Sequence, residues 1–112
     1  MSPIPAEAAR PPLVLTLDLG TSSTRALLFD GQGRQVEGVE ARAPYTVRTT
    51  PDGGADLDPT VVFEAVASCL DEATAQAAAR HLEIAAVGAC SLASSLVGIA
   101  DDEAITPIYT WA

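Results

Sequence analysis

Residues 18–25, which read DLGTSSTR, contain the side chains best suited to hold a phosphate group. Gly20 lets the backbone approach a ligand closely, and successive backbone N–H groups in a tight turn form an anion-binding hollow. Hydroxyl groups add donors, and the guanidinium of Arg25 adds a fixed positive fork. A phosphate would repel Asp18 unless a cation lay between them, and a hydrated Mg²⁺ is the natural choice. The candidate phosphate-binding residues are Asp18, Gly20, Thr21, Ser22, Ser23 and Arg25.

Other nucleotide-binding motifs do not match this sequence. A Walker A loop is excluded, because the chain contains no lysine. Gly31-Gln32-Gly33 lacks the third glycine of a dinucleotide fingerprint and lies in a predicted hairpin turn. An ordinary hairpin also favours Asp, Gly, Thr and Ser, so turn chemistry alone leaves a plain turn as an alternative to a phosphate site.

The elements around this turn are predicted to be three antiparallel strands. Leucines alternate with other residues over 13–19, which has the period of a strand. After the turn, residues 24–30 form a second strand. Residues 35–43 form a third, whose charges place it near a sheet edge. Residues 48–58 contain proline and glycine and read as a loop.

A helix is predicted to begin at Asp58 and Pro59, which suit the N-cap and the first helical position. Cationic side chains at Arg80 and His81 mark its end, where they favour the helix dipole. His81 is interpreted as a helix-end residue, since no nucleophile elbow or metal-ligand spacing accompanies it. One apolar stripe is expected to face the core, formed by Val62, Phe63, Val66, Leu70, Ala73 and Ala77.

The C-terminal part is predicted to contain further strands. Residues 84–89 read as a fully buried strand parallel to an earlier one, because they are apolar and follow a helix. Residues 96–100 and 105–111 read as extended segments around a turn at 101–103. The result is a mixed α/β sheet that ends just after a strand, so we expect an incomplete domain.

Composition limits the function classes. The 112-residue chain has a net charge of −9 and a pI near 4.2, which argues against nucleic acid and membrane-surface partners. Residues 1–12 are rich in proline, lack a signal peptide's apolar region, and are expected to form a disordered tail. Cys69 and Cys90 lie in apolar runs, so we expect both to be buried and reduced, as in the cytoplasm.

Residues 18–30 resemble the first phosphate motif of the FGGY carbohydrate kinases, which belong to the actin-like, sugar kinase and Hsp70 ATPase superfamily. The resemblance runs from about Leu13 to Trp111, and residues 95–99 and 106–112 are most similar to gluconokinase-like members. It implies a ribonuclease H-like (actin-like ATPase) fold. It also implies that residues 13–112 form the N-terminal part of the kinase's N-terminal domain.

The same resemblance assigns roles. The turn from Gly20 to Ser23 would contact the phosphates of ATP, Asp18 would hold Mg²⁺ through water, and Arg25 would neutralise charge near the transferred group. Such a kinase transfers the γ-phosphoryl group of ATP to a sugar or sugar-acid hydroxyl, with gluconate favoured. The general-base Asp is expected beyond residue 112, so no catalytic residue is assigned and this chain alone is expected to be inactive.

The sugar-binding side departs from the family pattern. Family members place polar or aromatic residues, often a His, just after the strand at Ile84, whereas this chain has Ser91-Leu92-Ala93-Ser94-Ser95. Ser94 and Ser95 are candidates to hydrogen-bond a polyol, with local capping as the alternative. Trp111 is a candidate to stack on a sugar face, with packing between strands as the alternative.

Two other functions fit the same residues. The chain would be a non-catalytic module that binds nucleotide or phosphate through the hairpin. Alternatively, it would be a structural remnant that folds only against a partner, because one face of its sheet is expected to be uncovered. That partner would be the remainder of the kinase or a second copy of the chain.

Overall fold

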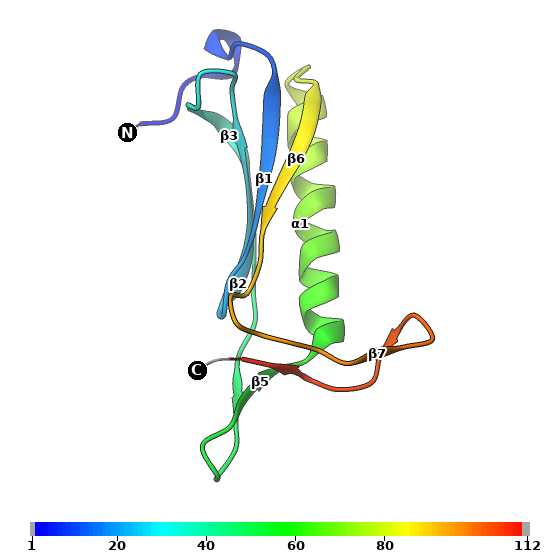
Figure 1. The fold of residues 1–112 in the computed structure, drawn as a ribbon. Helices are drawn as coiled ribbons and strands as arrows, with labels where there is room; N and C mark the ends of the chain where they lie inside the picture. The colour runs from blue at the N-terminus through cyan, green and yellow to red at the C-terminus, as the bar shows by residue number, and fades with distance from the viewer. Residues whose placement is uncertain (1, 111–112) are drawn as a thin grey trace.

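The main sheet has four strands in the order β3-β2-β1-β6 in the computed structural model, which describes residues 2–110 (Figure 1). The first three pair antiparallel, and β6 pairs parallel to β1. The polar third strand lies at the sheet edge, as predicted. The strand bounds are β1 Leu13–Leu19, β2 Ser23–Phe29, β3 Gln35–Pro44 and β6 Ile84–Cys90.

The helix α1, Pro59–Ala79, begins where the sequence predicted. The carboxylate of Asp58 accepts a hydrogen bond from the backbone N–H of Thr60, which satisfies one of the free donors of the first turn. The buried stripe is rotated around the helix relative to the prediction, because Ala65 and Cys69 are buried whereas Phe63 is 73% exposed. The buried helix residues are Val62, Ala65, Cys69, Ala73 and Ala77.

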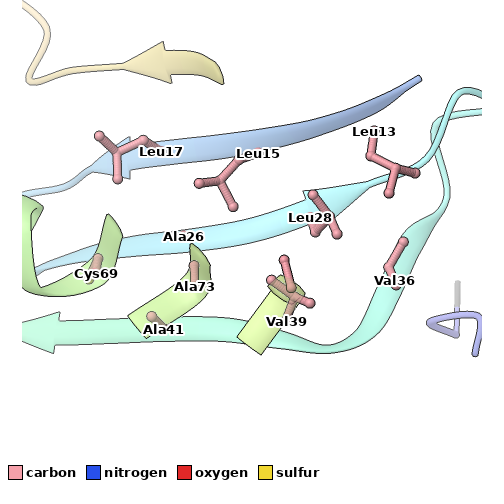
Figure 2. Packing of buried hydrophobic residues seen from close by; sticks show 11 residues of the cluster. Leu13, Leu15, Leu17, Ala26, Leu28, Val36, Val39, Ala41, Cys69 and Ala73 are labelled. Atoms are coloured by element: carbon pink, nitrogen blue, oxygen red, sulfur yellow. The ribbon is translucent and has the colours of Figure 1, made fainter. Parts of the chain in front are cut away.

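The core lies between the sheet and α1, which packs against β2 and β3. The alternation along β1 buries Leu13, Leu15 and Leu17, with exposures of 4%, 0% and 7%. Figure 2 shows these leucines beside Leu28 and the alanine-rich face of the helix. Burying one such side chain stabilises the fold by about 2 kcal/mol, so this layer dominates the stability of the sheet.

Short β elements lie beyond the N-terminal end of α1 (Figure 1). The segment predicted as a loop over 48–58 contains two of them, which pair with each other. A second apolar cluster joins this region to the helix, and its buried members are Tyr45, Leu57, Val62 and Ala65. The strands are β4 Arg48–Thr49, β5 Ala55–Leu57, β7 Ile99–Ala100, β8 Glu103–Ala104 and β9 Ile108–Tyr109.

The first dozen residues do not form the frayed tail expected from their prolines. Residues Ala6–Ala8 form a 3₁₀ turn, and Ile4 bridges in parallel to Val36 at the edge of β3. The N–H of Ile4 donates to the carbonyl of Gln35, which ties the segment to the sheet. Met1 lies outside the described residues.

Asp30, directly after β2, also holds the N-terminal segment against the sheet. Its buried carboxylate accepts hydrogen bonds from the backbone N–H groups of Arg10, Gln32 and Arg34. The guanidinium of Arg34 lies 2.7 Å from its Oδ2 and, as the main cause, holds the pKa of the Asp30 carboxyl well below its usual range. The backbone donors lower this pKa further, so the carboxyl stays ionised and ties the N-terminal segment to the hairpin.

The strand β6 is parallel to β1 as predicted, but the expectation that it is fully buried is wrong. Only Ile84 is partly buried, and the other residues of the strand are exposed. The helix covers β2 and β3 and leaves this edge strand open. Cys90 is therefore exposed, which corrects the prediction of two buried cysteines, whereas Cys69 is buried on the sheet-facing side of α1.

Candidate functional site

The turn between β1 and β2 presents free backbone donors to solvent. Gly20 donates its N–H to the carbonyl of Ser23 at 2.9 Å, and a Cβ at Gly20 would lie only 3.2 Å from that oxygen. Thr21 and Ser22 are exposed, and within residues 2–110 their N–H groups have no acceptor. Ser23 is 8% exposed, which makes its hydroxyl the least accessible of the three. The turn can therefore offer two N–H groups and two hydroxyls to an anion.

Tyr45 supports this turn from behind, and sequence reasoning missed it. Its hydroxyl donates to the carbonyl of Gly20 at 2.6 Å and lies 3.2 Å from the hydroxyl of Thr24. Its backbone N–H donates to the carbonyl of Ser22 at 3.0 Å. The sequence signal was an aromatic residue just after the predicted strand over 35–43, where antiparallel pairing brings the chain back to the turn.

Asp18 and Arg25 face each other across the β1–β2 ladder on the same side of the sheet. They are register partners, and an Arg25 nitrogen lies 3.1 Å from Oδ2 of Asp18. Both side chains are about half exposed, at 51% for Asp18 and 54% for Arg25. An exposed ion pair contributes only about 0–1 kcal/mol, so either partner can turn to a ligand at little cost.

The same row of the sheet continues through two residues that sequence reasoning did not place near the turn. Arg42 of β3 is the register partner of Arg25, and Cys90 of β6 is the register partner of Asp18. Since register partners project from the same face, a second guanidinium lies beside the first on the open side of the sheet. The period-2 pattern of β3 held this signal, but its register was unknown from sequence.

The candidate substrate-binding residues are Ser94, Ser95 and Trp111. Ser94 and Ser95 lie in the loop after β6, and the register of β6 with β1 brings this loop to the sheet edge that carries the Gly20–Ser23 turn. Ser94 is exposed with φ of 53°, and the hydroxyl of Ser95 donates to the carbonyl of Ala93 at 3.3 Å, which is the local capping alternative. Trp111 lies outside the described residues.

Both loops therefore leave the carboxyl ends of two neighbouring parallel strands, which is where open α/β sheets bind ligands. Within residues 2–110, no group of three or more His, Cys, Asp or Glu side chains gathers to hold a metal. A bound Mg²⁺ would thus rely on one carboxylate together with ligand oxygens and water. The helix of the described chain is not apolar enough over a sufficient length to cross a bilayer.

Residues 13–112 match the model of the FGGY family of carbohydrate kinases, N-terminal domain. The chain belongs to this family. It is 33% identical over 84 residues to an autoinducer-2 kinase from Salmonella choleraesuis strain SC-B67, an alignment that covers 75% of this chain and 16% of the relative. It is 31% identical over 96 residues to a glycerol kinase from Pseudomonas savastanoi pv. phaseolicola, covering 86% of this chain and 19% of that protein.

The fold agrees with this assignment. The crystal structure of a gluconate kinase from Lactobacillus acidophilus superposes with a TM-score of 0.73 at 30% identity, over 88% of this chain and 19% of that one. The mixed α/β sheet predicted from sequence is thus that of the actin-like sugar kinases. This member of the FGGY family spans about a fifth or less of the length of the relatives it matches.

Proposed function

We propose that this chain is the phosphate-binding part of an ATP-dependent kinase that phosphorylates a sugar or sugar acid. The observation that carries the proposal is the Gly20–Ser23 turn, whose outward N–H groups lie next to a carboxylate and a guanidinium on one sheet face. Phosphoryl transfer needs such groups chiefly for positioning and charge neutralisation.

Each residue has a distinct role in this proposal. The N–H groups and hydroxyls of Thr21 and Ser22 bind phosphate oxygens, while Gly20 keeps the turn tight. Arg25 leaves its weak pair with Asp18 and neutralises charge on the phosphates, with Arg42 close behind it. Asp18 is then free to hold a cation.

Mg²⁺ fits this arrangement, because an exposed carboxylate stands beside free anion-binding donors. Mg²⁺ binds through one or two carboxylates and phosphate oxygens and retains several waters. When bound, the ion would supply charge neutralisation to the phosphates of ATP. Asp18 would hold it through water and orient it toward the turn.

The acceptor is a hydroxyl of a small polyol, sugar or sugar acid. The relatives are named as kinases of autoinducer-2, glycerol and gluconate, and gluconate is the acceptor that we favour here. Ser94 and Ser95 stand at the sheet edge that bears the turn, and we assign them, with Trp111, to the acceptor side. Free cysteines and the acidic surface suit a protein of the reducing cytoplasm.

The direct test is an NMR titration of the ¹⁵N-labelled chain with Mg·ATP. We expect the amide resonances of residues 20–23 to shift in a saturable manner. Replacing Asp18 with Asn should weaken binding by about tenfold, because one charge-assisted contact is lost. Inorganic tripolyphosphate should shift the same amide resonances, since the turn is proposed to bind the phosphates of ATP and not its adenosine.

The chain offers a matched control for this substitution. Arg48 and Asp56 form a second ion pair between antiparallel register partners, 2.7 Å apart, in which Arg48 is exposed and Asp56 is partly buried. Asp56→Asn should leave the affinity for Mg·ATP unchanged. A folded wild-type chain whose turn amides do not move would refute phosphate binding by this chain.

A coupled assay of gluconate phosphorylation distinguishes a part of a kinase from a non-catalytic binding module. We expect binding without turnover from the 112 residues, because the general base is assigned to a later part of the kinase. Addition of the remainder of the enzyme as a separate chain should restore phosphorylation. Rapid turnover by this chain alone would contradict the division of roles.

A further inference from the structure

Tyr45 is the point where the second apolar cluster meets the candidate phosphate-binding turn. Its side chain is 8% exposed and packs with Leu57, Val62 and Ala65, which come from β5 and α1. Its hydroxyl and its backbone N–H nevertheless form hydrogen bonds with the β1–β2 turn and with Thr24 of β2. A buried phenol needs a hydrogen-bond partner, and here the partners belong to the turn and its flanking strand.

The hydrogen bonds around Tyr45 have one consistent direction. The carbonyl of Gly20 can only accept, so the hydroxyl of Tyr45 donates to it at 2.6 Å. The hydroxyl of Thr24, 3.2 Å away, is then left to donate to Tyr45. The chain of donors runs from Thr24 through Tyr45 to Gly20. It ends on the peptide group that links Gly20 to Thr21.

Peptide planarity converts this contact into an orientation of the free donor. In a trans peptide the C=O and the following N–H point in opposite directions. Fixing the Gly20 carbonyl on Tyr45 therefore directs the N–H of the exposed Thr21 away from Tyr45. The backbone N–H of Tyr45 fixes the carbonyl of Ser22 in the same way, at 3.0 Å, which directs the N–H of Ser23 away from Tyr45.

We propose that Tyr45 is a positioning residue that presets the turn for phosphate binding by orienting its peptide groups. This inference rests on the proposed function of the turn. Tyr45 does not touch the phosphate, and it acts through Gly20 and Ser22. Preorganisation of this kind raises affinity, because the ligand does not have to order the loop. Leu92, in the loop after β6, packs on the same cluster and thereby joins the acceptor side to the turn.

The test compares Tyr45→Phe with Tyr109→Phe, which removes the hydroxyl of a half-exposed tyrosine in β9. Phe keeps the ring in the apolar cluster and removes only the hydroxyl. We expect Tyr45→Phe to weaken Mg·ATP binding about three- to tenfold and to shift the Thr21 amide resonance of the unliganded chain. Tyr109→Phe should change neither. Both readings are made well below the melting temperature, where a loss of stability alone would not alter them.

The outcomes separate this inference from the proposed function. A wild-type chain that binds no Mg·ATP overturns both. Wild-type binding with equal affinity in Tyr45→Phe overturns the inference alone. If Tyr45→Phe does not fold, the wild type labelled with 3-fluorotyrosine replaces it. The ¹⁹F resonance of Tyr45 should then move on addition of Mg·ATP while that of Tyr109 stays fixed, and an unmoved Tyr45 resonance overturns the inference.

Discussion

β1 and β6 are neighbouring parallel strands of one sheet, yet one is buried and the other is open to solvent. The contrast is sharpest at register partners, since Leu15 is 0% exposed and Val87 is 56% exposed. Both are apolar, so composition does not explain the difference. The helix packs against β2 and β3 and does not extend over β6. Whether a strand of this sheet is buried thus depends on whether the helix packs over it. The helix covers one part of the sheet and leaves β6 uncovered.

The two cysteines offer the largest test of this contrast. Cys69 lies on the buried face of α1, where burial raises the pKa of its thiol, whereas Cys90 is exposed at the end of β6. We expect alkylation of Cys90 to be faster by roughly three orders of magnitude, since exposing a core thiol requires opening of the core. Rates measured by mass spectrometry would check this. Comparable rates would mean that the helix does not stay packed on the sheet in solution.

Truncation of Leu15 tests the energetic side of the comparison. Leu15→Ala should lower the free energy of unfolding by about 2–5 kcal/mol, because it leaves a cavity between sheet and helix. The matched change Val87→Ala should cost less than about 1 kcal/mol, because its side chain is already half in water. Urea denaturation of both variants measures the two values. Equal losses would show that β6 is covered in solution.

The ion pair at Asp30 gives a smaller, pH-dependent effect within the covered half. The unfolded chain protonates this carboxyl near pH 4 by its usual chemistry, whereas the folded chain holds its pKa lower. The unfolded state therefore binds more protons in acid, so stability is present above about pH 4 and falls as the pH drops toward the folded pKa. Asp30→Asn should reduce stability at neutral pH and flatten this acid loss. Urea midpoints across the acid range test it. Asp71→Asn, on the exposed side of α1, is the control, and parallel curves for the wild type and Asp30→Asn would contradict the assignment.

The sequence predicted what depends on neighbours along the chain. The alternation of leucines over β1, the N-cap at Asp58 and the parallel strand at Ile84 were all predicted, because each signal lies within a few residues. The pairing of Asp18 with Arg25 also follows once the hairpin is recognised.

What depends on distant contacts was not predicted. The support of the turn by Tyr45 joins residues 25 positions apart, so no local pattern reveals it. The exposure of β6 and of Phe63 depends on where the helix axis lies over the sheet, which periodicity does not determine. The order of the first dozen residues follows from Asp30 and β3, whereas their own composition suggested a loose end.

The bridge between Ile4 and Val36 has a consequence for how this sheet meets other chains. A free sheet edge is a template for strand addition by another molecule. The N-terminal segment occupies the start of the β3 edge, and the bonds from Ile4 take up the polar groups of Gln35 and Glu37 that a foreign strand would need. Within residues 2–110 the outer edge of β6 has no such guard. The start of the β3 edge is therefore closed to strand addition, whereas the edge of β6 is open to it.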